Sequence, residues 1–144
     1  SRGYLEIQSP DPMQAPRVDA NYLSDERDWQ EMIAGTRLVR DIARMPALAD
    51  ISDGEIAPAP EMESDDDIMD VIREHSWTVF HQCGTCRMGR DASSAVVDER
   101  LAVHGIDGLR IADASIFPTI PTGNTNAPAI MVGEKAASII RGET

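Results

Sequence analysis

The chain has 144 residues, enough for one ordinary domain that buries roughly two-thirds of the surface of its unfolded state. Its formal net charge of -12 argues against a nucleic-acid or anionic-membrane partner, because both attract clustered Lys and Arg. No run of about 18 apolar residues is present, so the sequence predicts no membrane span.

The first third of the chain is predicted to hold a strand and a long helix. Residues 4–8 alternate like a strand and end at a turn cluster, and residues 13–23 are expected to be extended and irregular. Ser24 is the expected N-cap of the helix. Pro46 should end this helix, because proline disfavours the α conformation of the residue before it.

A second, shorter helix is predicted after a surface loop over residues 50–62. Ser64 and Asp67 resemble a capping box, with Asp in place of Glu or Gln. The acidic residues around this start are typical of a solvated first turn. They are Glu61, Glu63, Asp65, Asp66 and Asp67.

The second half of the chain mixes short extended segments with one helix. Residues 77–80 are β-prone, and residues 109–112 are a candidate buried strand. The last helix should begin near Pro128, which suits a first turn, and stop at Gly142. This irregular mixture predicts an α+β fold without internal repeats.

His81 is the first candidate functional residue, because it follows the β-prone segment and precedes a Gly84-Thr85 turn. A histidine in this position is most often structural. An imidazole that is neutral near pH 7 can nevertheless accept a proton from a hydroxyl group. Phe80 could exclude water from such a site.

Two further segments are candidates for ligand contact. Asp113 and Ala114 end the strand predicted at 109–112, and ligands gather at strand ends in open α/β sheets. Residues 123–126 lead into the last helix, whose first N–H groups and dipole favour negative charge. By themselves, Asp113 and Ala114 are equally typical of a plain turn, and Gly123-Asn124 is most often a turn and helix cap.

Taken together, three segments resemble the C-terminal region of the glucose-methanol-choline (GMC) family of flavin-dependent oxidoreductases, and the resemblance covers nearly the whole chain. They are residues 81–89, 108–118 and 123–128. The resemblance implies FAD as cofactor and a small-molecule alcohol as substrate. It implies that His81 takes the hydroxyl proton while hydride passes from the carbinol carbon to flavin N5.

The family pattern places His or Asn beside the substrate oxygen, and counting back from Glu134 in the terminal helix puts Asn124 at that position. The chain therefore resembles the His/Asn branch, to which choline oxidase belongs. An amide can orient the oxygen but cannot take its proton, which leaves His81 as the base. The resemblance also assigns a set of residues to the flavin, namely Phe80, Asp113, Ala114, Asn124, Thr125 and Asn126.

The resemblance further implies how the chain divides. Residues 1–100 would belong to an antiparallel-sheet substrate domain, and residues 101–144 would return to a Rossmann-like FAD domain as its closing strand, active-site loop and terminal helix. No Gly-x-Gly-x-x-Gly phosphate turn occurs in the sequence. The expected partner is therefore the N-terminal FAD-binding portion, as an upstream segment or a second chain.

Alternatives remain open at this point. Hydroxynitrile lyases of the same family keep FAD but perform acid–base cleavage, and a non-catalytic accessory chain could retain the motif. Cys83 and Cys86 could join His75 and His81 in a zinc set or form a redox pair. Small buried residues are the preferred interpretation of both cysteines, and no metal is expected.

Overall fold

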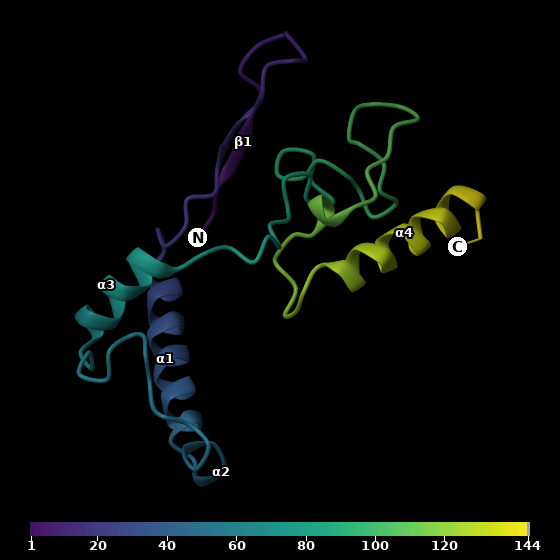
Figure 1. Cartoon of the computed structure of the whole chain (residues 1–144). Helices are drawn as coiled ribbons and strands as arrows, with labels where there is room; N and C mark the ends of the chain where they lie inside the picture. The colour runs from purple at the N-terminus through teal and green to yellow at the C-terminus, as the bar shows by residue number, and fades with distance from the viewer. Residues whose placement is uncertain (144) are drawn as a thin grey trace. The chain divides into compact units, whose positions relative to one another are not determined.

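The computed structural model describes residues 1–143 and divides into two compact units, Ser1–Trp77 and a second unit that begins at Thr78. Figure 1 traces the helices and strands along the chain. Helices are combined with a small antiparallel sheet, in agreement with the predicted α+β class. Within the described residues no helix is long and apolar enough to cross a membrane.

The first unit starts with a hairpin of β1 (Tyr4–Glu6) and β2 (Arg17–Asp19). The strands are antiparallel, with Leu5 opposite Val18. The guanidinium carbon of Arg17 lies 5.4 Å from the centre of the Tyr4 ring, an additional cation–π contact. The strand predicted at 4–8 is therefore present in shorter form, and its partner comes from the segment predicted to be irregular.

Helix α1 (Glu26–Ala43) begins one residue later than predicted, because Asp25 rather than Ser24 is its N-cap. The Asp25 carboxylate accepts hydrogen bonds from the backbone N–H of Arg27 and from its guanidinium. These bonds lower the pKa of Asp25 well below its usual range. As predicted, the helix ends before Pro46, which instead opens the short helix α2 (Pro46–Ala49).

Helix α3 (Asp65–His75) has the predicted capping box. The Ser64 hydroxyl accepts from the Asp67 N–H at 3.1 Å, and the Asp67 carboxylate accepts from the Ser64 N–H at 3.4 Å. The apolar face of α3 packs on the start of α1 (Figure 1). The core of this unit consists of Ile68, Met69 and Ile72, against which Leu23, Trp29 and Ile33 pack.

A buried arginine on α1 fixes the loop predicted at 50–62. The Arg40 guanidinium forms an ion pair with Glu55 at 2.8 Å and donates to the backbone carbonyls of Ala59 and Met62. Because these acceptors satisfy the charge, the arginine can be buried without leaving an unpaired ion in the core. The loop is thus held against the helix by one side chain.

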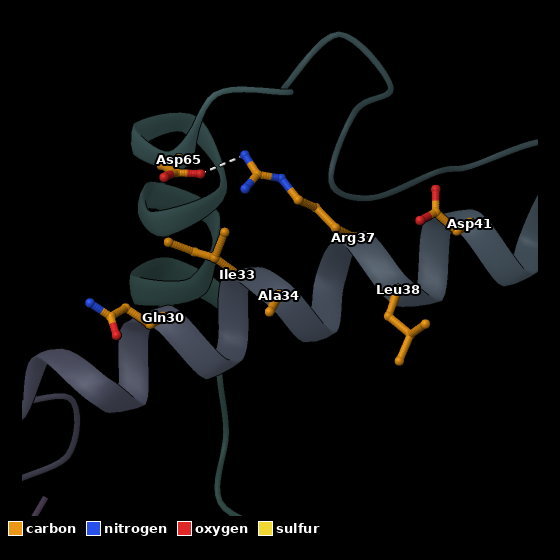
Figure 2. A pocket seen from close by; sticks show the side chains of 7 residues that line it. All are labelled: Gln30, Ile33, Ala34, Arg37, Leu38, Asp41 and Asp65. Atoms are coloured by element: carbon orange, nitrogen blue, oxygen red, sulfur yellow. Dashed lines mark hydrogen bonds and ion pairs between the residues drawn. The ribbon is translucent and has the colours of Figure 1, made fainter.

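A shallow pocket of about 440 Å³ lies on α1 beside the start of α3. Figure 2 shows Arg37 reaching from α1 to Asp65, and the residues that line the pocket include the apolar Ile33 and Leu38. The pocket belongs wholly to the Ser1–Trp77 unit, and none of the candidate functional residues lines it.

The second unit is built around one apolar cluster, and most of the chain before α4 (Asn126–Arg141) that contributes to it has no regular secondary structure. Its buried residues are Val97, Leu101, Ile116, Val132, Ala136 and Ile139. Isolated bridges join Met88 to Val97, Val97 to Val103, and Ala102 to Arg110. The short extended segments predicted around 97 and 102 are therefore present as single bridges rather than as a continuous sheet.

Two strand predictions in the second half of the chain are wrong. Residues 77–80 form no strand, since Phe80 has a φ of 60° that no strand residue adopts. Residues 109–112 form only the single bridge at Arg110, and Leu109 is 47% exposed rather than buried. Residues 101–103 run antiparallel beside this segment, and the Val103 N–H donates to the Leu109 carbonyl, but the pairing is limited to one bridge and does not extend into a sheet.

Helix α4 (Asn126–Arg141) agrees closely with its prediction. Pro128 lies in its first turn, and Gly142 ends it with a left-handed φ of 74°. Val132, Ala136 and Ile139 form its buried stripe. The division of a larger protein at residue 100 stays a prediction, and residue 144 lies outside the described residues.

Replacing Ser64 by Ala should lower the free energy of unfolding by about 1 kcal/mol, because the N-cap of α3 loses its oxygen. Ser76→Ala, at the exposed far end of the same helix, should change it little. Chemical denaturation followed by circular dichroism measures both variants. Equal effects of the two substitutions would contradict a specific capping role.

Candidate functional site

Two backbone hydrogen bonds connect the segment after His81 to the segment after Asp113. The N–H of Cys86 donates to the carbonyl of Ser115 at 2.9 Å, and the N–H of Met88 donates to that of Ile116 at 2.7 Å. Ile116 belongs to the buried cluster that also contains three residues of α4. The three segments singled out in the sequence therefore share one core.

Gly84 allows the histidine segment to run close to the second segment. Its φ is 88°, and a Cβ at this position would lie 3.0 Å from the carbonyl oxygen of Phe117. Both the left-handed backbone and the short distance favour glycine. The Gly84-Thr85 turn noted in the sequence is thus a point of close backbone approach.

His81 follows a residue with unusual backbone geometry. Phe80 has a φ of 60° and is 69% exposed, so the chain turns sharply just before the histidine. The hydroxyl of Thr78 receives hydrogen bonds from the Phe80 N–H at 3.0 Å and from the Gln82 amide at 2.9 Å. Left-handed geometry at a non-glycine residue costs roughly 1–3 kcal/mol and is concentrated at functional sites.

The imidazole of His81 contacts the start of α4. Its Nδ1 lies 2.9 Å from Oγ1 of Thr125, and both groups are partly buried. Thr125 is only 9% exposed although it immediately precedes the helix. The structure therefore brings together His81 and one member of the predicted Gly123–Asn126 loop, across 44 positions of sequence.

Thr125 has the position of an N-cap but not its usual contact. It adopts αR geometry, with φ -77° and ψ -7°, and its side chain makes no capping hydrogen bond to α4. An N-cap threonine normally accepts from an N–H of the first turn, worth about 1 kcal/mol. Here the hydroxyl is directed to the histidine instead.

Asp113 and Ala114 form the turn that enters the 3₁₀ helix η1 (Ala114–Ile116). The Asp113 carboxylate accepts from the N–H of Ser115 at 2.8 Å, so it caps this short helix. Ala114 is half-buried. Contact of these two residues with a flavin stays a prediction. In the structure, Asp113 caps η1 and Ala114 begins it.

Asn124 and Asn126 flank the buried threonine and are both exposed. The His81 ring contacts the Thr125 hydroxyl that lies between them. Asn124 immediately precedes Thr125, the hydrogen-bond partner of His81. The role of Asn124 at the substrate oxygen stays a prediction.

The start of α4 has two features that the predicted flavin site would require. The first turn has no side-chain cap, so its N–H groups are available to an electron-rich acceptor. Apolar side chains just before His81 and on either side of the start of α4 are exposed and could cover a planar aromatic ligand. These are Val79, Phe80, Ile120, Ile130 and Met131.

The two cysteines and the remaining histidines are not gathered around His81. Cys83 and Cys86 are half-buried and are not joined in a disulfide. The Nε2–H of His104 donates to the Gly89 carbonyl, and His75 lies exposed at the end of α3. In the part of the chain that the structure describes, no three His, Cys, Asp or Glu residues are arranged to hold a metal ion.

The contact between Thr125 and His81 is the feature that sequence reasoning missed. Thr125 was expected at the flavin because it begins a helix, and no periodicity links it to residue 81. The sequence signal for this contact was the residue type alone, because a threonine at an N-cap position carries a hydroxyl oxygen that can accept a hydrogen bond.

Comparison with known proteins gives a family. A model described as GMC oxidoreductase matches residues 1–133. An "Oxygen-dependent choline dehydrogenase" of Escherichia coli O139:H28 is 49% identical over 143 residues, which is 99% of this chain and 26% of that protein. The chain therefore spans about a quarter of the length of the curated relatives it matches.

Solved structures give the same fold. A formate oxidase of Aspergillus oryzae RIB40, in a study of FAD modification, matches with a TM-score of 0.91 at 32% identity, over 99% of this chain and 25% of that one. A fungal aryl-alcohol oxidase matches with a TM-score of 0.89 at 32% identity, over 98% and 23%. The Rossmann-like assignment of residues 101–144 is not confirmed by these matches.

Replacing Gly84 by Ala should destabilise the protein by roughly 1–3 kcal/mol and displace the His81 segment, because the new Cβ meets the Phe117 carbonyl in a left-handed backbone. Gly105→Ala is a matched control, since Gly105 has a φ of 76° but open space around it. Thermal unfolding should show the larger loss for Gly84→Ala. An equal loss would mean that the close approach contributes nothing.

Proposed function

Because this chain belongs to the GMC oxidoreductase family, we propose that it supplies the proton-accepting half of the active site of an FAD-dependent alcohol oxidoreductase. The observation that carries the proposal is the partly buried hydrogen bond between His81 and Thr125 at the start of α4. It holds an imidazole beside an uncapped helix start, where an anionic or electron-rich group is favoured.

His81 would act as the base. Its Nδ1 is engaged by Thr125, so Nε2 is the nitrogen for a substrate hydroxyl. A general base must lie within hydrogen-bonding distance of the proton it removes and must be held in orientation. Partial burial and the fixed Nδ1 contact meet the second requirement. Removal of the proton gives alkoxide character to the substrate and so makes hydride departure from its carbinol carbon easier.

Asn124 would orient the substrate oxygen. It immediately precedes Thr125, which fixes its backbone close to the histidine's partner, and its exposed side chain is available to a ligand. An amide N–H can donate to an alcohol oxygen and more strongly to the developing alkoxide. Asn124 would therefore lower the barrier without competing for the proton.

FAD, when bound, supplies the acceptor for the hydride. The residues that would hold its ring system are those around the start of α4 and the turn at Asp113, together with the exposed Phe80. The uncapped N–H groups of Asn126 and Ala127 would stabilise negative charge on that ring.

A choline-like primary alcohol is the first substrate to test. The 49% identity to an oxygen-dependent choline dehydrogenase extends over 99% of this chain. Identity to the aryl-alcohol oxidase is 32%. The net charge of -12 is also compatible with a cationic substrate, because an acidic protein attracts cations.

The remaining part of such an enzyme would cover exposed apolar side chains of this chain. On α1 these include Leu38, Val39 and Ile42, and on α4 they include Ile130, Met131 and Ile140. Apolar surface of this kind usually marks a docking site. The N-terminal FAD-binding portion is the proposed occupant.

The decisive experiment is the visible spectrum of the full-length protein, recorded before and after anaerobic addition of choline, benzyl alcohol and other alcohols. Bleaching of an oxidised flavin by one alcohol is the expected result. A bound flavin that stays oxidised with every alcohol, together with release of cyanide from cyanohydrins, would replace the proposal by lyase chemistry.

Replacing His81 by Gln should lower kcat for the bleaching alcohol roughly 10²- to 10⁴-fold, because the base is lost while the hydrogen-bonding shape is kept. Flavin content should not change. His75→Gln is the control, since His75 is exposed on α3. Full turnover in His81→Gln would show that the chain is a non-catalytic accessory part.

Replacing Asn124 by Ala should lower kcat roughly 10²-fold, the usual cost of removing one donor to a developing oxyanion. Thr122→Ala, in an exposed position of the same loop, serves as control. Stopped-flow flavin reduction measures both. A change in KM alone would mean that Asn124 binds the substrate without assisting the chemical step.

A further inference from the structure

The hydrogen bond at Nδ1 has a consequence for the proton carried by the ring. Neutral imidazole has one N–H and one lone pair. If Nδ1 carries the proton, it donates to Oγ1 of Thr125, and the lone pair lies on Nε2. If Nε2 carries the proton, Nδ1 must accept from the hydroxyl, and Nε2 has nothing with which to accept a proton from substrate.

The local geometry favours the first arrangement. The Oγ1 of Thr125 makes no capping hydrogen bond to α4, so its lone pairs are not occupied by the first-turn N–H groups. The side chain is also almost completely buried, and its position is therefore fixed by packing. A hydroxyl can donate or accept, and with its lone pairs not used at the helix cap the Thr125 Oγ1, 2.9 Å from Nδ1, is placed to accept an Nδ1–H.

We propose that Thr125 is a positioning residue, whose hydroxyl accepts the Nδ1–H of His81 and thereby keeps Nε2 unprotonated and oriented for the substrate. The proposal rests on the proposed function, because it needs His81 to be the base. It differs from the expected flavin contact of Thr125, which would involve the start of α4 rather than this side chain.

The kinetic test compares three variants of the full-length, flavin-loaded protein. Thr125→Val keeps the shape but removes the hydroxyl, and should lower kcat for the bleaching alcohol at least tenfold with little change in KM or flavin content. Thr125→Ser keeps the hydroxyl and should retain most of the activity. Thr122→Val, an exposed threonine three positions away, should behave as the unchanged protein.

A direct test is the tautomer of the ring. With ¹⁵N-labelled histidine, the two ring nitrogens of a neutral imidazole have well-separated NMR frequencies, and His81→Gln identifies the signals of His81. The expected result is a protonated Nδ1 in the unchanged protein and in Thr125→Ser. Thr125→Val should shift the signals toward the form with the proton on Nε2.

The outcomes separate this proposal from the proposed function. An Nε2-protonated ring in the unchanged protein, or full kcat and an unaltered tautomer in Thr125→Val, would overturn the role of Thr125 even if alcohols bleach the flavin. An Nδ1-protonated ring that depends on the Thr125 hydroxyl would support that role. A flavin that no alcohol reduces would then count against the proposed reaction alone.

Discussion

The arrangement of the second unit depends on the short backbone pairing between residues 86–88 and 115–116. This pairing ties the chain after His81 to Ile116, and Ile116 shares a buried cluster with α4. Glycine at position 84 allows this close approach, because it has no Cβ. A Cβ there would lie 3.0 Å from the carbonyl oxygen of Phe117. Without the pairing, a histidine on an irregular segment would have no fixed relation to a helix that starts more than 40 residues later.

Two residues beside His81 have backbone or capping geometry that lowers the local stability of the chain. Phe80 adopts a left-handed backbone immediately before His81, and Thr125 leaves α4 without its side-chain cap. Each feature costs on the order of 1 kcal/mol relative to the ordinary geometry. Both costs fall on residues that border the imidazole, which is the pattern expected where orientation of a functional group is maintained at the expense of local stability.

The two units differ in how their polar groups are used. In the Ser1–Trp77 unit, Arg40 holds a whole loop through Glu55 and backbone carbonyls, and Arg37 reaches Asp65. In the second unit the partly buried polar contacts include those of the His81 ring with a hydroxyl and of the His104 ring with a backbone carbonyl. The apolar side chains left exposed on α1 and α4 fit a chain that spans a quarter of its relatives' length, because such surface needs a covering partner.

The sequence by itself determined helices α1, α3 and α4 and the family. Periodicity, the Ser64–Asp67 box and the Pro128 and Gly142 signals are local, so α3 and α4 were predictable from neighbouring residues. The motifs from His81 to Asn126 were sufficient for the family. Only the tertiary structure decided that residues 77–80 and 109–112 are not strands, that Asp25 caps α1, that Arg40 anchors a loop, and that Thr125 meets His81. These features depend on contacts between distant segments or on competition between adjacent polar groups, which no local pattern encodes.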